Sequence, residues 1–144
     1  MRSLLDINVL ISLLDPDHSH HERAQDWWRD NRNAGWASCP ISENGFIRIM
    51  SNPSYPAEVH FSPAKAIVDL YDFVSMSDHE FWADNISMLD DKVFESKRIL
   101  GSRQLTDIYL LALAVQHSGR LVSFDQRISA SSVRNATTTN LCII

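Results

Sequence analysis

Four acidic residues are candidates for holding a metal ion: Asp6, Glu43, Asp107 and Asp125. Asp6 and Asp125 each follow a short apolar run, and Glu43 and Asp107 fall in the first turn of expected helices. Mg²⁺ in proteins is held by a few carboxylates together with waters and phosphate oxygens. Such an ion lowers the pKa of bound water and stabilises negative charge on a phosphate under attack. The set is therefore suited to metal-assisted hydrolysis of a phosphate ester.

Each of these acids also has a structural explanation when it is taken alone. An aspartate after a strand is commonly a turn former or a helix cap. A carboxylate in the first turn of a helix is stabilised by the helix dipole, which accounts for Glu43 and Asp107. The stronger observation is that all four acids fall where an expected strand ends or an expected helix begins.

The elements that would position the acids alternate between strands and helices. Short apolar runs predict strands at 3–5, 36–39, 73–76, 121–124 and 141–144. Helical spacing of apolar residues predicts helices at 9–14, from 19, 40–50, from 62, from 77 to about 89, and 107–118. Strands that alternate with helices indicate βαβ units and a parallel sheet, and hence an α/β fold. Ligands of such sheets bind beyond the carboxyl ends of the strands, where these acids are expected.

Three helix starts are predicted from capping signals. Ser19 and Glu22 form a Ser-x-x-Glu capping box. Ser62 precedes Pro63 as an N-cap before a proline in the first turn, and Thr106 is a candidate N-cap for the helix that carries Asp107. The helix after Ser62 is expected to turn inward the residues Ala66, Ile67, Leu70 and Tyr71.

Length and composition predict one packed domain over residues 1–144. Hydrophobic residues make up 44% of the chain, and it has only 4 Gly and 5 Pro. Its apolar runs are all shorter than the roughly 18 residues that a membrane helix needs, so we expect no membrane association. Cys39 and Cys142 lie far apart and follow no Cys-x-x-Cys spacing. They are expected to be buried free thiols in a reducing cytoplasm.

The formal net charge of −5 does not by itself favour a nucleic-acid partner. Lysine and arginine normally supply most of the affinity for phosphate backbones. If the four proposed carboxylates bind metal, 14 acidic residues remain against 13 basic ones, before the charge of the metal is counted. The charge therefore permits an RNA substrate without pointing to one.

Four segments together carry a family resemblance: Leu4–Leu10, Ser42–Arg48, Leu105–Ala114 and Leu121–Asp125. In this order they strongly resemble a PIN-domain ribonuclease of the VapC toxin type, and the resemblance spans the whole chain. It implies a three-layer α/β/α fold with a short, mostly parallel five-stranded sheet. It also implies an endoribonuclease dependent on Mg²⁺ or Mn²⁺ that acts as the toxin of a type II toxin–antitoxin pair, forms a homodimer and is inhibited by a VapB-like antitoxin.

The resemblance assigns roles to individual residues. Asp6 and Asp107 match the principal metal ligands of the family, and Glu43 and Asp125 complete its acidic pocket. Asn8 matches a position that orients the first aspartate, and it is equally explained as a turn asparagine. The two small hydroxyl residues near the implied site are Thr106 and Ser123. This sequence departs from many relatives after Asp125, where Gln126 and Arg127 stand in place of a further acid, which leaves a second metal position in doubt.

Arginines and aromatic residues offer further candidates for contacts. Arg48, Arg103 and Arg127 could contact single-stranded or looped RNA, and each is equally well explained as a solvated surface charge. A zinc role for His18, His20 and His21 is disfavoured because adjacent histidines point to different helix faces. Four tryptophans, at 27, 28, 36 and 82, are favoured as core or dimer contacts over base-stacking platforms.

Two other functions remain as alternatives to a toxin nuclease. One is a catalytically inactive PIN-like module that binds RNA or protein, and the presence of all four acids argues against it. The other is a housekeeping nuclease without a partner, which a short chain with no appended RNA-binding segment makes less favoured.

Overall fold

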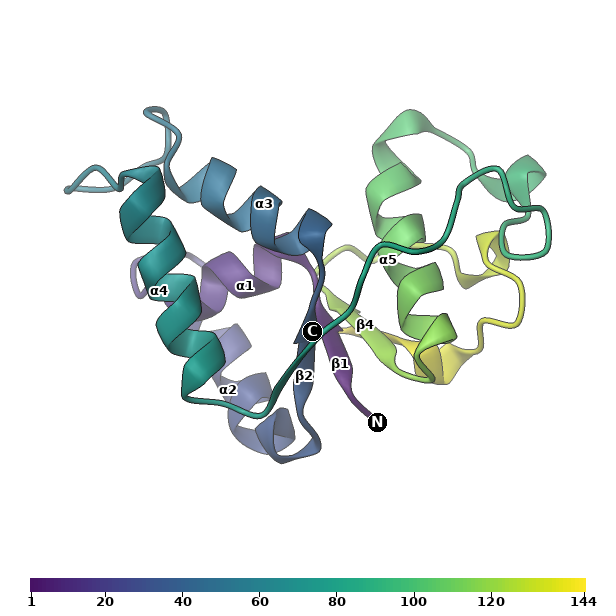
Figure 1. Ribbon diagram of the computed structural model, residues 1–144, viewed down its shortest axis with the longest axis horizontal. Coiled ribbons are helices and arrows are strands. Elements are labelled where there is room, and N and C mark those ends of the chain that lie inside the picture. The colour runs from purple at the N-terminus through teal and green to yellow at the C-terminus, as the bar shows by residue number, and fades with distance from the viewer.

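The computed structural model describes residues 1–144 and shows five short parallel strands between layers of helices (Figure 1). The strands are β1 (Ser3–Leu5), β2 (Trp36–Ser38), β3 (His79–Phe81), β4 (Arg120–Ser123) and β5 (Leu141–Ile143). They lie side by side in the order β3-β2-β1-β4-β5, and every pairing is parallel. The predicted α/β/α architecture with a five-stranded parallel sheet is confirmed.

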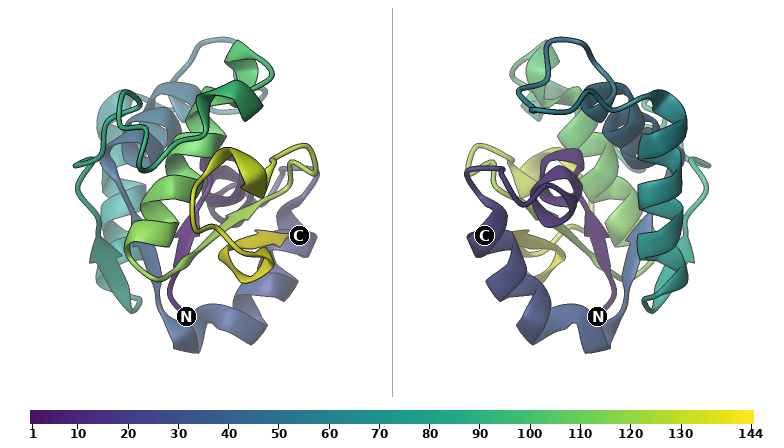
Figure 2. Two further views of the ribbon diagram at one scale, coloured as in Figure 1. Left: turned by 90° about the vertical axis from the view of Figure 1, so that its right-hand side faces the viewer. Right: turned by 90° about the vertical axis from the view of Figure 1, so that its left-hand side faces the viewer.

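Five α-helices cover the sheet. They are α1 (Ile7–Leu14), α2 (His21–Asn31), α3 (Pro40–Met50), α4 (Pro63–Ser75) and α5 (Leu105–Gln116), joined by several short 3₁₀ turns. Figure 1 shows α1, α3 and α4 on one side of the strands and α5 on the other. The two side views in Figure 2 show the C-terminal segment lying beside α5 on one side of the sheet, and α1, α2 and α4 on the other.

Each face of the sheet has its own apolar core. Leu4 and Leu121 pack with the α5 side, whereas their neighbours Leu5 and Val122 pack with the side of α1 to α4. Successive residues of a strand point to opposite faces, so β1 and residues 121–123 of β4 are buried on both sides. These two central strands therefore end in fixed positions, and the residues that follow them are held equally firmly.

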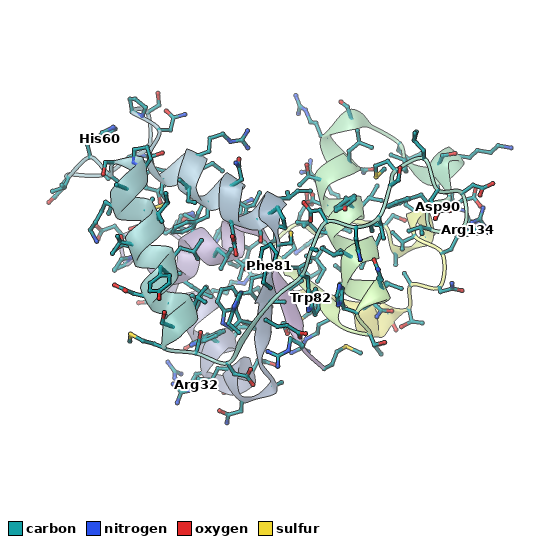
Figure 3. All side chains as sticks on the ribbon, in the orientation of Figure 1. Arg32, His60, Phe81, Trp82, Asp90 and Arg134 are labelled. Atoms are coloured by element: carbon teal, nitrogen blue, oxygen red, sulfur yellow. The ribbon has the colours of Figure 1, made fainter.

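The prediction for residues 73–89 is wrong. Residues 73–76 were expected to be a strand and 77–89 a helix, but α4 continues to Ser75 and β3 occupies His79–Phe81. Phe73 and Val74 follow Leu70 at helical spacing and pack against the same core, so the short apolar run extends the helix. After β3 the chain crosses to the α5 side as a loop. Phe81 is exposed there, whereas Trp82 is buried and stacks on His117 (Figure 3).

The predicted caps and inward faces were only partly right. Ser62 caps α4 as expected, by accepting a hydrogen bond from the backbone N–H of Lys65 at 3.1 Å. The Ser19 capping box does not form, since α2 begins at His21 and the N–H of His20 bonds to His18 Nδ1 instead. Thr106 is not a cap, because α5 already starts at Leu105.

Two further expectations differ in detail. Ala66 and Leu70 of α4 are buried as predicted, but Ile67 and Tyr71 are half or more exposed, so this helix buries a narrower stripe than expected. Both cysteines are free, with Cys39 buried and Cys142 only partly so.

No helix has the length and apolar character required to cross a membrane.

Candidate metal centre

Asp6 is placed by the end of β1 and the start of α1. Its side chain caps α1 by accepting the N–H of Ile7 at 2.7 Å, and its second oxygen accepts the Ser123 hydroxyl at 2.9 Å. The residue is only 5% exposed. Burial raises the pKa of Asp6, and nearby Asp125 adds to that rise, while the hydrogen bonds from Ser123 and Ile7 oppose it. A buried carboxylate is therefore held in one orientation without a cationic partner.

Asp107 reaches the same place from the first turn of α5. Burial, together with the negative charges of Asp6 and Asp125, raises the pKa of Asp107 to about 6, against a smaller lowering by Arg127. Like charges shift one another's pKa in this way only when they are close. The sheet and α5 thus bring together three of the four predicted acids.

Asp125 lies just past β4 and is the one acid of this group with a cationic partner. Arg127 donates to both of its carboxylate oxygens at 3.0 Å, through Nε and Nη2. These hydrogen bonds lower the pKa of Asp125. Its backbone N–H donates to Ser123 Oγ at 3.1 Å, so one hydroxyl joins Asp125 to Asp6. Ser123 is the small hydroxyl residue that the sequence placed near the site.

The donor chemistry of this cluster suits a hard divalent cation. Asp6, Asp107 and Asp125 offer only oxygen atoms as ligands. Their combined negative charge exceeds the positive charge of Arg127, the single arginine beside them. As the side chains stand, no three acidic, histidine or cysteine residues enclose a position that could hold an ion. The carboxylates would have to turn toward a bound cation, and Asp125 would have to exchange part of its contact with Arg127.

Glu43, the fourth predicted acid, makes its contacts elsewhere. It sits in the first turn of α3 and accepts the Ser38 hydroxyl at 2.5 Å. Ser38 Oγ is also 2.7 Å from His79 Nε2. Because the only hydroxyl proton goes to Glu43, His79 must donate to Ser38, which defines the chain His79 to Ser38 to Glu43. Glu43 is thus tied to the end of β2, and its role as a metal ligand stays a prediction.

The asparagine, the threonine and the arginines that were expected near the site have different surroundings. The carboxylate of Asp6 is oriented by Ile7 and Ser123, whereas Asn8 is exposed in α1. Thr106 lines a hollow beside the site that also contains Arg48. A second hollow, on the side of Asp125, contains Arg103 and Arg127. Arginines are therefore present on both sides of the acidic cluster.

Comparison with known proteins identifies the family. The model of the PIN domain family matches residues 3–132. The chain belongs to the PIN domain family. Ribonuclease VapC44 of Mycobacterium tuberculosis is 48% identical over 144 residues, which is the full length of both proteins. Ribonuclease VapC39 of the same organism is 40% identical over 132 residues, or 92% of this chain and 94% of that protein. This PIN domain is therefore of the VapC type, as the sequence motifs predicted.

A solved structure has the same fold. The crystal structure of VapBC2 from Rickettsia felis, bound to a DNA fragment from their promoter, matches with a TM-score of 0.59. The match covers 100% of this chain and 98% of the other at 13% identity. At that identity the likeness concerns the fold alone, and it agrees with the PIN-like α/β/α arrangement seen here.

The histidines disfavoured as zinc ligands and the tryptophans disfavoured as base-stacking platforms make structural contacts in this PIN domain. His18 and His21 bond to the hydroxyl and carbonyl of Ser12 and so fasten α2 to α1. Trp36 and Trp82 are fully buried in the core. These contacts agree with a packing role.

Sequence reasoning missed three residues around the site: Ser38, His79 and Asp84. Ser38 carried a weak signal, a hydroxyl at the end of an expected strand five residues before Glu43. His79 and Asp84 carried none, because the segment that contains them was expected to be a helix. The edge strand β3 and the loop after it bring both residues close to α3.

Proposed function

We propose that this chain is a metal-dependent endoribonuclease that acts as the toxin of a VapBC pair. The main support is the cluster of Asp6, Asp107 and Asp125 at the carboxyl ends of β1 and β4. It stands in a PIN domain whose full-length relative, 48% identical, is named a ribonuclease. The reaction we assign is hydrolysis of an RNA phosphodiester by an activated water, with Mg²⁺ as the cation and Mn²⁺ as a substitute.

The side chains divide the work as follows. Asp6 and Asp107 would hold the principal cation, and Glu43 and Asp125 would hold a second cation or position the attacking water. A bound divalent cation would lower the pKa of water and offset charge at the scissile phosphate. Ser123 holds the Asp6 side chain next to the Asp125 backbone, because its hydroxyl donates to Asp6 and accepts from the Asp125 N–H. Arg127 forms an ion pair with Asp125. If a cation bound Asp125 instead, the guanidinium could contact a phosphate.

An antitoxin and a second copy of the chain are the proposed partners. We expect a VapB-like antitoxin to cover the acidic cluster and to place an arginine or lysine among its carboxylates, where they lack positive charge. Homodimerisation and a single domain spanning residues 1–144 complete the proposal. Co-expression with the small reading frame beside the gene should relieve growth arrest caused by this protein. Persistent arrest together with no binding would contradict the antitoxin assignment.

Cleavage of total cellular RNA by the purified protein tests the nuclease directly. Reactions contain Mg²⁺, Mn²⁺ or EDTA, and a parallel set uses Asp6→Asn, which keeps the size of the side chain and one of its two acceptor oxygens. We expect discrete fragments that require both the cation and Asp6. Cleavage by Asp6→Asn at the parent rate would show that the site is wrong. Intact RNA in every reaction, from folded protein free of antitoxin, would favour a binding module without catalysis.

A further inference from the structure

A polar pocket adjoins the acidic cluster on the side of α3. It has a volume of about 380 Å³. Its lining includes Ile7, which follows Asp6, and Thr106, which precedes Asp107, so the pocket opens directly beside the two proposed principal ligands. Figure 1 shows α3 and the start of α5 facing one another above the strand ends. A nucleotide next to a phosphate held at the cluster would reach this pocket.

The walls of the pocket offer opposite hydrogen-bonding groups. Arg48 and Asn44 come from one face of α3, and Asp84 comes from the loop that crosses to the α5 side after β3. All three are exposed, and Arg48 takes part in none of the ion pairs of the protein. The guanidinium is therefore free to donate to a ligand.

Asp84 has room to accept hydrogen bonds from a ligand, and it takes part in none of the ion pairs of the protein. Desolvation raises the pKa of Asp84, while its interactions with the Cys39 thiol and the Ile41 backbone at the start of α3 oppose that rise. A carboxylate has about four acceptor positions, so positions remain available toward the pocket.

The apolar part of the pocket lies where α3 meets the start of α1. A Cβ on Gly45 would lie 2.4 Å from Cδ1 of Ile7, so glycine lets the two helices lie this close without displacing the Ile7 side chain. Ile7 and Ile41 are the apolar residues there, joined by Pro40. Apolar surfaces flanked by a few convergent polar groups are typical of small-ligand sites.

We propose that this pocket binds a guanine base next to the scissile phosphate. Guanine has two parallel N–H donors, at N1 and N2, which fit the two oxygens of one carboxylate such as Asp84. Its O6 and N7 acceptors fit an arginine such as Arg48. Adenine lacks the paired donors, and the pyrimidines lack N7. The pocket thus gives sequence preference to the proposed nuclease, and the inference rests on that proposed function.

Equilibrium binding of short uridine-rich oligonucleotides with one central G, A, C or inosine tests the pocket. Fluorescence anisotropy in EDTA keeps the RNA intact, and repulsion by the acidic cluster weakens all four RNAs equally. We expect the wild-type protein to bind the G oligonucleotide about tenfold more tightly than those with A or C. Inosine, which lacks the N2 amino group, should fall between them.

Two variants with matched controls assign that preference to the pocket. Asp84→Asn and Arg48→Ala should each reduce the preference for G by about tenfold. Asp30→Asn and Arg32→Ala change exposed residues of the α2 region and should preserve the preference, because neither residue lines the pocket. Thermal denaturation identifies a variant that has lost its fold, and Arg48→Ala breaks no ion pair within the protein.

The outcomes separate this inference from the proposed function. Equal affinity for all four RNAs, or a preference for G that survives in both pocket variants, would overturn the guanine pocket. If the protein then still cleaves RNA with metal, the nuclease assignment stands alone. A preference for G that needs Asp84 and Arg48, from protein that cleaves no RNA, would support the pocket and contradict the nuclease.

Discussion

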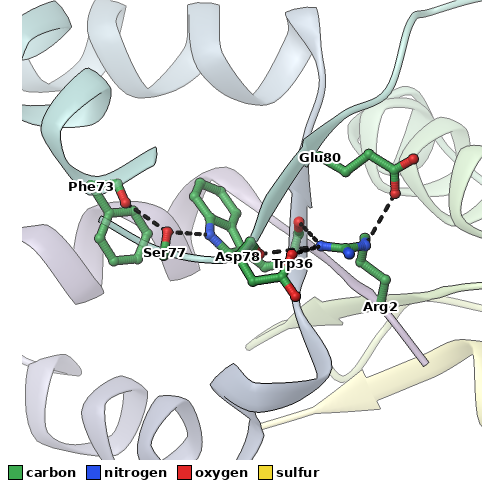
Figure 4. Close-up of polar contacts among 6 residues, drawn as sticks. All are labelled: Arg2, Trp36, Phe73, Ser77, Asp78 and Glu80. Atoms are coloured by element: carbon green, nitrogen blue, oxygen red, sulfur yellow. Dashed lines mark hydrogen bonds and ion pairs between the residues drawn. The ribbon is translucent and has the colours of Figure 1, made fainter. Parts of the chain in front are cut away.

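The two ends of the parallel sheet carry charge in opposite ways. At the amino end, Arg2 pairs with Asp78 at 2.9 Å and with Glu80 at 3.1 Å, and it donates to the carbonyl of Trp36 (Figure 4). The Trp36 indole there donates to Ser77 at 2.8 Å. At the carboxyl end, three carboxylates gather and only one of them has an arginine.

The difference separates charges that stabilise the fold from charges that the fold must tolerate. A partly buried arginine with two carboxylates satisfies its donors and holds β3 against the rest of the sheet. Carboxylates crowded at the other end repel one another, which raises the pKa of Asp107 and lowers the stability of its ionised form. A bound cation would relieve repulsion of this kind, which is consistent with the proposed metal site.

The largest expected effect comes from neutralising the crowded end. Asp107→Asn should lower metal-dependent RNA cleavage by about 100-fold or more, because one anionic ligand is lost. In the absence of metal, the same change should raise the free energy of unfolding at pH 7 by about 1 kcal/mol, because the repulsion among the three carboxylates decreases. Cleavage kinetics and urea unfolding measure both quantities.

A matched substitution at the other end completes that test. Asp78→Asn removes a carboxylate that is paired with Arg2, so it should leave cleavage unchanged and should not stabilise the protein. If Asp78→Asn and Asp107→Asn shift stability in the same direction, the proposed contrast between the two ends is wrong.

A second effect concerns the paired end. Arg2→Met should lower the free energy of unfolding by about 1–2 kcal/mol, because the Trp36 carbonyl loses a donor and two carboxylates lose their partner. Cleavage should be unaffected in the remaining folded protein. Arg29→Met breaks only the exposed pair with Asp26 and should change stability by less than about 0.5 kcal/mol. Equal losses in the two variants would argue against a special role for Arg2.

The smallest effect is a dependence of metal-free stability on pH. The folded protein binds a proton at Asp107 with a pKa of about 6, whereas an unfolded aspartate has a pKa of about 3.9. The folded state therefore holds more protons between these values, and the contribution of Asp107 to stability falls as the pH rises from 4 to 7. The advantage of Asp107→Asn over the wild type should accordingly grow across this range, by about 1 kcal/mol.

Urea unfolding at several pH values, with and without Mg²⁺, measures this difference. We expect saturating Mg²⁺ to remove it, because a bound cation compensates the ionised carboxylate. A difference between wild type and Asp107→Asn that is independent of pH would show that Asp107 does not titrate in this range.

The central part of this protein could be predicted from the sequence because its signals are local. Ser3–Leu5 and 121–124 are apolar runs followed by an aspartate, and such runs in an α/β pattern become buried parallel strands. The strand ends then fix Asp6 and Asp125, and the helix that begins near Thr106 brings Asp107 to them. Short motifs around these acids were enough to predict the family.

The edge of the sheet could not be predicted in the same way. His79–Phe81 is polar or exposed along most of its length, and it becomes a strand only because β2 lies beside it. The run at Phe73 and Val74 has strand-like composition, but it completes the buried stripe of α4. Pairing and packing partners outweighed local preference in both segments.

The sequence by itself determined the alternation of strands and helices outside residues 73–89, and the acids at strand ends and helix starts, because these depend on apolar spacing and on residue type. Tertiary structure alone decided which charges are neutralised. It brought Arg2 to Asp78 and Glu80, tied Glu43 to Ser38, and left Asp6 and Asp107 close together with no ion pair to a basic side chain. Electrostatic energy depends on distance and burial in three dimensions, and neither can be read from positions along a chain.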